Sequence, residues 1–404
     1  MRCNNVMFAA LLFLVVQDVS AQKNEGDSCV EEHTNIVGRC TRPEQCKAAE
    51  DDFQLNGIRP TFCEYTFQQV LVCCRDGSSI LQTAGDRRKE AGTVWGVAES
   101  LADKRRVSER KCEEYSRAVV QKVDYTALLP DPGTMSLSAA NCDYTGVELI
   151  VGGEDANQGE FPHMAAIGWV DYDDGYTFSC GGSLISSKFV LTAGHCVSNP
   201  RARYRTPAIV RLGDQNLDPA VKDGANPVEV PIKTIHKHPD YMPPKRYNDI
   251  ALLELAADVD FENSVRPACL WSRPDFGNHT KAFATGWGST DPRTNRPAKE
   301  LQKVSLSLLN NEYCDKLLTD GRNRLWSGFA ASQLCAGELR GGKDTCQGDS
   351  GSPLQVASSD NQCIFHVIGV TSFGRLCAQS GQPAVYTRVS SYLDWIESVV
   401  WPGE

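Results

Sequence analysis

Short apolar runs dominate the second part of the chain. Residues 150–404 contain many β-branched and aromatic stretches separated by Gly, Pro, Asn and Asp, for example Phe189–Thr192, Ile209–Leu212 and His366–Phe373. Runs of this length between turn-forming residues are typical of β-strands. We therefore expect an all-β domain over this region.

A longer periodicity predicts helices at two places. Leu393, Ile396 and Val400 recur at helical spacing, which predicts a terminal helix packed on the β core. Residues 75–141 are mostly polar and charged, a composition typical of a mobile linker. Within this linker, Cys112–Val123 has the pattern of a short helix.

The first residues have the pattern of a secretory signal, residues 1–21. Arg2 precedes the uncharged apolar run Val6–Val16, and the small residues at 19–21 form a cleavage site. This run is too short to span a bilayer, and no later stretch is long and apolar enough. We therefore expect a secreted, extracellular protein without a membrane anchor.

Cysteine usage agrees with export. The chain has 404 residues, enough for at least two folded units, and 17 cysteines, of which Cys3 lies in the signal. The remaining even number predicts disulfides and not metal sites. Six of them crowd into residues 29–74, a segment too short to fold without crosslinks. The net charge of -10 argues against nonspecific nucleic-acid binding.

Three motifs carry residues for nucleophilic catalysis. VLTAGHC places His195 beside a cysteine that can hold its turn, and NDIALL places Asp249 at the mouth of an apolar run. GDSG sets Ser350 in a glycine-flanked turn that leaves the hydroxyl open. A base, its orienting carboxylate and a nucleophile in this chain order match the chymotrypsin type of triad.

Residues 150–404 resemble the catalytic domain of trypsin-like serine proteases through IVGG, TAGHC, NDIALL, GWG and GDSG. The resemblance implies two six-stranded β-barrels with the active site between them. It makes His195 the general base, Asp249 its orienting partner and Ser350 the nucleophile. The backbone N–H groups of Gly348 and Ser350 then form the oxyanion hole. We expect neither a cofactor nor a metal.

The same resemblance implies a substrate specificity. Asp344 occupies the base of the primary pocket, where a carboxylate selects Arg or Lys. Ser372 and Gly374 belong to the strand that lines this pocket and pairs with the substrate backbone, with Phe373 replacing the usual tryptophan. Ala384 replaces a family glycine and narrows the pocket, so the preference between Arg and Lys stays open.

Activation by cleavage is implied as well. Ile150 resembles the new amino terminus of activated zymogens, and its ammonium pairs with Asp349 in the active form. The preceding residue is Leu149, after which a protease with Asp344 in its pocket cuts poorly. We therefore expect an upstream activating protease with apolar specificity and, downstream, another protease zymogen as the substrate.

The cysteine-rich segment, which ends in adjacent cysteines, resembles the clip domain of arthropod clip-domain serine proteases, most of all the C subgroup with the Snake-type enzymes. The implied pairs are Cys29–Cys73, Cys40–Cys63, Cys46–Cys74, Cys180–Cys196, Cys314–Cys335, Cys346–Cys377 and Cys142–Cys269. Parity then pairs Cys112 with Cys363, although an exchange of partners between these last two pairs stays open.

The resulting plan is a signal at 1–21, a clip domain at 29–74, a linker and activation region at 75–149, and a protease domain at 150–404. Family resemblance implies a haemolymph cascade, in melanisation through prophenoloxidase activation, in Toll signalling or in embryonic patterning, with serpin inhibitors as partners. Asn278 lies in a glycosylation sequon. The alternatives are a clip-domain binding homologue without catalysis, which Ser350 disfavours, and a digestive trypsin.

Overall fold

Two compact units make up the chain, residues 1–102 and residues 103–404, and each is described by itself. Among the described residues, no helix has the length and apolar character needed to cross a membrane. The computed structural model describes residues 24–30, 37–47, 49, 60–65, 70–75, 105–117, 120–126, 134–140, 154–289, 297–339, 348–358, 361–374 and 381–404.

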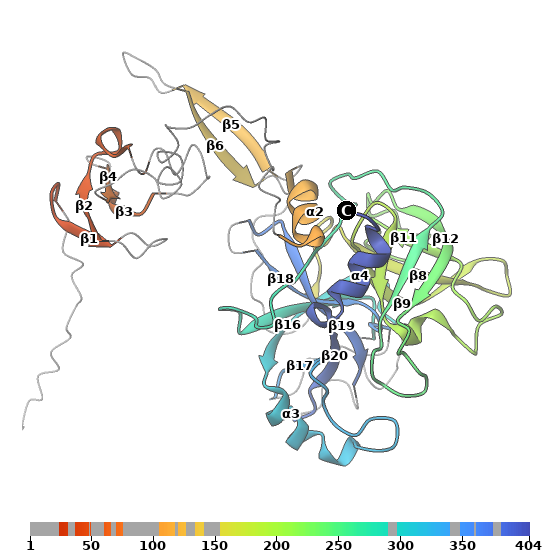
Figure 1. Ribbon diagram of the computed structural model, residues 1–404. Helices are drawn as coiled ribbons and strands as arrows, with labels where there is room; N and C mark the ends of the chain where they lie inside the picture. The colour runs from red at the N-terminus through yellow and green to blue at the C-terminus, as the bar shows by residue number, and fades with distance from the viewer. Residues whose placement is uncertain are drawn as a thin grey trace, which may run out of the picture. The chain divides into compact units, whose positions relative to one another are not determined.

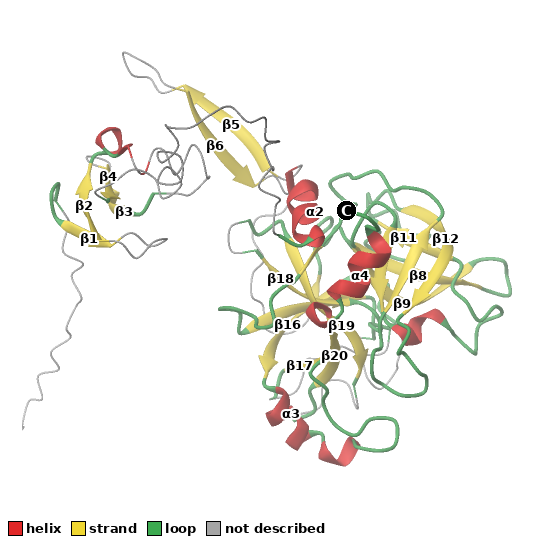
Figure 2. Ribbon diagram, viewed as in Figure 1, coloured by secondary structure: helices red, strands yellow, loops and turns green. Residues whose placement is uncertain are grey.

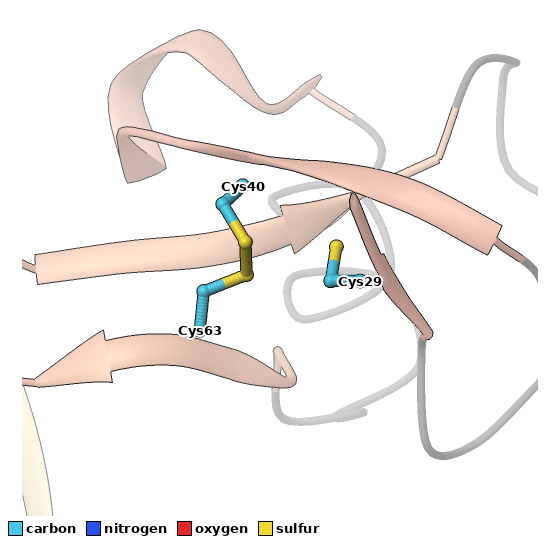
Figure 3. A group of neighbouring side chains, drawn as sticks. All are labelled: Cys29, Cys40 and Cys63. Atoms are coloured by element: carbon cyan, nitrogen blue, oxygen red, sulfur yellow. A yellow bond between two sulfur atoms is a disulfide. The ribbon is translucent and has the colours of Figure 1, made fainter. Parts of the chain in front are cut away.

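The first unit is a small antiparallel sheet with strand order β1-β2-β4-β3. Its disulfides are those expected, Cys29–Cys73, Cys40–Cys63 and Cys46–Cys74. Figure 3 shows the bond between Cys40 of β2 and Cys63 of β3, with Cys29 beside it. The cystines fill much of the interior, together with the buried Leu71. The elements are β1 Ser28–Val30, β2 Val37–Thr41, a 3-10 turn Pro43–Gln45, β3 Phe62–Tyr65 and β4 Val70–Cys74.

Two six-stranded β-barrels form the second unit (Figures 1 and 2). The first barrel closes in the order β10-β13-β12-β11-β8-β9. Its interior holds alternate strand residues such as Ile167, Val210 and Leu253, all fully buried. Its strands are β8 Met164–Val170, β9 Tyr176–Leu184, β10 Phe189–Thr192, β11 Ile209–Leu212, β12 Val228–Lys237 and β13 Ala251–Leu255.

The second barrel runs β19-β18-β15-β16-β17-β20 and closes through pairing of β20 with β19. The short β14 (Cys269–Leu270) pairs in parallel with β19, and β7 (Glu154–Asp155) pairs with β16. Its strands are β15 Lys281–Gly286, β16 Gln302–Leu309, β17 Gln333–Gly337, β18 Pro353–Ala357, β19 Phe365–Phe373 and β20 Ala384–Arg388. The expected all-β architecture is confirmed.

The terminal helix α4, Leu393–Val400, is also confirmed. Leu393, Ile396 and Val400 lie in one buried cluster with Ile250 of the first barrel and Val370 of the second. This helix therefore packs where the barrels meet. The remaining helical elements are α3 Asn311–Leu317 and the 3-10 turns Gly194–Val197, Thr319–Gly321 and Val389–Ser391.

The expected linker contains a docked helix with bounds other than those predicted. Helix α2 is Val107–Ser116, not Cys112–Val123, because Glu109 accepts a hydrogen bond from the backbone N–H of Arg106 and caps an earlier start. Downstream, the chain forms β5 Val120–Thr126, which pairs with β6 Thr134–Ala140. Within the segment predicted to be a mobile linker, α2 therefore packs on the protease domain.

For the last two predicted disulfide pairs, the structure supports the exchange of partners that the sequence left open. Cys112 of α2 bonds Cys269 of β14, with 5.0 Å between their Cα atoms, so neither Cys142–Cys269 nor Cys112–Cys363 forms. Cys112 bonds Cys269 because α2 packs directly on β14, a contact that forms only in the tertiary structure. Cys363 is disulfide-bonded, and Cys142, Cys346 and Cys377 lie outside the described residues. Cys180–Cys196 and Cys314–Cys335 form as expected.

Candidate active site

His195 lies in a 3-10 turn directly after β10, and a disulfide fixes this turn to β9. The bond joins Cys196 to Cys180. Gly194 lets the turn approach the Tyr241 ring, because a Cβ at this glycine would lie 2.7 Å from a ring carbon. The imidazole is thereby held in place while its side chain stays about one third exposed, at 35%.

Asp249 contributes a buried, negatively charged carboxylate to the site. Its carboxylate is buried and accepts three hydrogen bonds, from the His195 backbone N–H at 2.8 Å, from His195 Nδ1 at 2.8 Å and from the Ser372 hydroxyl at 2.5 Å. The Asp249 carbonyl in turn accepts from Thr387 Oγ1 at 2.9 Å. These contacts come from both barrels, so the site lies where the barrels meet.

His195 and Asp249 shift each other's pKa. Burial opposes a charged imidazole, but the charge of Asp249 and its hydrogen bond outweigh burial and raise the pKa of His195. Burial alone would raise the pKa of Asp249. The charge of His195 and the hydrogen bonds that the Asp249 carboxylate accepts nevertheless hold that pKa below its ordinary value. Asp249 is therefore ionised while His195 titrates.

Ser350 lies in a turn that two glycines make possible. Gly348 and Gly351 have φ of 106° and 79°, a region that favours glycine. A Cβ on Gly351 would lie 2.2 Å from Thr192 Oγ1, so this turn packs directly against the end of β10. The Ser350 carbonyl accepts a hydrogen bond from Gly181 N–H at 2.8 Å.

These contacts bring Ser350 to the His195 turn. Gly181 follows Cys180, the residue crosslinked to Cys196 beside His195. Within the described part of the chain no hydrogen bond joins the Ser350 hydroxyl to His195. Such bonds are often long without a substrate.

Asp349, beside the candidate nucleophile, has a buried carboxylate against a glycine-lined wall. Its Oδ1 accepts from Gly288 N–H at 2.8 Å. A Cβ on Gly286 or on Gly288 would lie 2.2 Å from a carboxylate oxygen of Asp349, so only glycine fits these positions of the GWG motif. Leu149 and Ile150 lie outside the described residues.

The structure describes some of the predicted substrate-binding residues. Ser372 and Gly374 lie at the end of β19, and the buried Ala384 begins β20. A Cβ on Gly374 would lie 3.9 Å from the Ala384 methyl, so these two residues face each other. Asp344 lies outside the described residues, whereas Asn278 is exposed.

Two features of the site were missed from the sequence. Ser372 was expected only to line a pocket, but its hydroxyl also bonds Asp249. Arg246, three residues before Asp249, stacks its guanidinium 4.4 Å from the centroid of the Phe373 ring. No pattern in the sequence signals either contact, since each joins segments more than a hundred residues apart.

A model of the trypsin family, described as Trypsin, matches residues 150–396. The chain belongs to the trypsin family. It is a serine endopeptidase, and the match includes all three residues of the expected triad.

The N-terminal unit adds a second likeness. The chain is 35% identical over 391 residues to Serine protease snk of Drosophila melanogaster, covering 95% of this chain and 80% of that protein. It is 30% identical over 308 residues to CLIP domain-containing serine protease B4 of Anopheles gambiae, covering 73% of this chain and 82% of that protein. Phenoloxidase-activating factor 3 of Holotrichia diomphalia is 37% identical over 265 residues, covering 62% of this chain and 72% of that protein. Together with its disulfide-rich unit, these likenesses identify an arthropod clip-domain serine protease similar to the Snake type.

Proposed function

We propose that the protein is a secreted protease zymogen in which His195, Asp249 and Ser350 form the catalytic triad. The observation that carries this proposal is the hydrogen bond between His195 Nδ1 and the buried Asp249 carboxylate. With the Nδ1 proton held by Asp249, Nε2 keeps its lone pair and is free to accept the Ser350 proton. Ser350 then attacks the substrate carbonyl, and His195 returns the proton to the leaving amine.

The oxyanion of the tetrahedral intermediate needs donors beside the nucleophile. The N–H groups of Gly348 and Ser350 are proposed for this role, because the positive φ of Gly348 shapes the turn that holds them. Loss of one such donor costs about 10²-fold to 10³-fold in turnover.

We further propose cleavage after Arg or Lys, with Asp344 as the carboxylate that selects the basic side chain. Ala384 supports a narrow pocket, since its methyl is buried and faces Gly374 across the strands. A difference of one methyl group in such a wall is worth about 1 to 3 kcal/mol between substrates. The preference between Arg and Lys is measurable with matched peptides.

Activation is proposed to occur by cleavage after Leu149, with the Ile150 ammonium then pairing with Asp349. The burial of the Asp349 carboxylate against Gly286 and Gly288 supports this proposal, because a buried carboxylate is stabilised by a cation. The segment after the cut is anchored nearby, because Glu154 of β7 lies 3.3 Å from Lys303 of β16, which also binds the buried Glu160 at 2.9 Å.

The proposed setting is an extracellular insect cascade. Support comes from the names of the relatives, a phenoloxidase-activating factor and a clip-domain protease. On this basis the substrate is a downstream protease zymogen, in melanisation or in Toll signalling, and serpins are the proposed inhibitors.

A serine-directed fluorophosphonate probe tests the catalytic proposal. Protein cut after Leu149 should be labelled at Ser350, whereas uncut protein and the Ser350→Ala variant should not. Absence of labelling in correctly cut protein would instead support the alternative of a clip-domain binding homologue without catalysis.

A further inference from the structure

A cavity of about 260 Å³ adjoins the proposed substrate-binding strand. Phe373 and Gly374, which follow Ser372 at the end of β19, form part of its wall. Leu318, Trp326 and Val385 supply apolar surface, and Arg246 and Asp320 supply charge. The cavity therefore lies beside the path proposed for a substrate.

Arg246 is held rigidly at this cavity. Its backbone N–H donates to the Leu325 carbonyl at 3.1 Å, and its carbonyl accepts from Gln333 Nε2 at 2.8 Å. Gln333 also accepts from Trp326 Nε1 at 3.2 Å. The guanidinium lies over the Phe373 ring, which itself packs edge-on against Trp326 with 5.5 Å between ring centroids.

Within the described part of the chain, no carboxylate lies within ion-pair distance of Arg246, although the side chain is half-buried. A planar guanidinium with free N–H groups is suited to bind a carboxylate through two hydrogen bonds. Because Arg246 is already ordered by stacking, such binding costs little additional conformational entropy.

Arg246 also acts on the catalytic base. Its positive charge works against the raised pKa of His195. Contacts give the same position, because Arg246 stacks on Phe373 and the adjacent Ser372 hydroxyl donates to Asp249. A ligand of Arg246 therefore lies close to the reacting groups.

We propose that Arg246 is a specificity-determining residue that binds an Asp or Glu side chain of the substrate, close to the cleaved bond. This inference rests on the proposed function, because it requires that Ser372–Gly374 pair with the substrate backbone. Asp320 also lines the cavity but is exposed, so solvent and salt screen its repulsion more than they screen the attraction of the half-buried Arg246.

The test uses activated full-length protein and peptides with one cleavable Arg. Each peptide carries either Glu or its isostere Gln at one of the three positions before that Arg. At one position, the wild-type protein should cleave the Glu peptide with kcat/KM about tenfold higher than the Gln peptide, as one charge-assisted contact provides. In 1 M salt this ratio should fall toward one.

Substitutions at Arg246 test whether this residue causes the preference for Glu over Gln. Arg246→Ala should bring the Glu-to-Gln ratio to within about twofold, and Arg246→Glu should invert it in favour of Gln. Arg324→Ala, which removes an exposed cation of a nearby loop outside the cavity lining, should leave the ratio unchanged.

Each contrary result is distinguishable. Equal cleavage of the Glu and Gln peptides at all three positions by wild-type protein overturns the inference while leaving cleavage after Arg intact. A preference that survives in Arg246→Ala or in high salt also overturns it. Failure of the wild-type protein to cleave after Arg or Lys at all removes the proposed specificity and, with it, this inference.

Discussion

At the scale of single residues, the site depends on the hydrogen bonds that the buried carboxylate of Asp249 accepts. Asp249 receives hydrogen bonds from a backbone N–H, an imidazole and a hydroxyl. A buried charge with several donors stays ionised, whereas an unsatisfied one would take up a proton. The Ser372 hydroxyl therefore contributes to the state of His195 without touching it.

The pH dependence of the activated protein follows from this arrangement. His195 acts as a base only when neutral, and its pKa is raised above the ordinary value of 6.5. The value of kcat/KM should therefore fall as the pH decreases, with a midpoint above 6.5. A pH profile with a small Arg peptide measures this midpoint.

Asp249→Asn is the matched variant for this profile. Without the carboxylate charge the midpoint should move to lower pH, and turnover should drop about 10⁴-fold because the tautomer is wrong. A wild-type midpoint clearly below that of free histidine would contradict the assigned ion pair.

At the scale of elements, helix α2 is joined to the protease domain by more than its disulfide. Arg106 forms ion pairs with Glu397 at 2.9 Å and with Asp394, both on α4. The Ser108 hydroxyl donates to Glu397 at 2.6 Å, and Tyr115 accepts a hydrogen bond from Trp401 Nε1 at 3.3 Å. After cleavage at Leu149, these contacts hold the upstream chain together with Cys112–Cys269.

A variant without the crosslink tests this docking. Because the exchanged pairing gives Cys363 to Cys142 as a second tether, the variant replaces both pairs. In Cys112→Ser/Cys269→Ser/Cys142→Ser/Cys363→Ser protein cut after Leu149, the two chains should stay together on size exclusion at low salt. Adding Arg106→Ala should release the upstream chain, because Glu397 would lose its ion pair in a partly buried position.

Arg105→Ala is the matched control, since Arg105, just before α2, forms an ion pair with Glu113 of α2 within the same upstream chain. It should leave the two chains associated. Dissociation of the crosslink-free protein without any change at Arg106 would show that the disulfide alone retains the upstream chain.

The elements also show where sequence patterns fail. The spacing of Leu393, Ile396 and Val400 predicted α4 because one helical face must meet the core. The start of α2 was missed although its Arg106–Glu109 cap joins residues only three apart. The docking of α2 was not predictable, since it depends on contacts with α4 almost three hundred residues away. This segment was interpreted as a linker only because its residues are mostly polar and charged.

At the scale of the whole molecule, the proposed activation cut follows Leu149, a residue after which this enzyme is not expected to cleave. Trypsin should therefore fail to generate the Ile150 terminus, whereas a protease that cuts after large apolar residues should generate it with gain of activity. N-terminal sequencing and a peptide assay measure the two outcomes together.

A Leu149→Arg variant provides the control. It should become activatable by trypsin, because the cut site then carries the basic residue that trypsin selects. Clean cleavage of the wild-type protein before Ile150 by trypsin, with full activity, would contradict the proposed dependence on an apolar-specific activator.

Local chemistry by itself determined the all-β pattern, the helix α4 and the three motifs around His195, Asp249 and Ser350, because strand periodicity, helical spacing and glycine-flanked turns are properties of neighbouring residues. Only the tertiary structure decided that Cys269 bonds Cys112, that α2 docks on α4 and that Ser372 donates to Asp249. The same holds for Arg246 on Phe373. Each of these contacts joins segments distant in sequence, and its geometry exists only once the barrels have closed and packed.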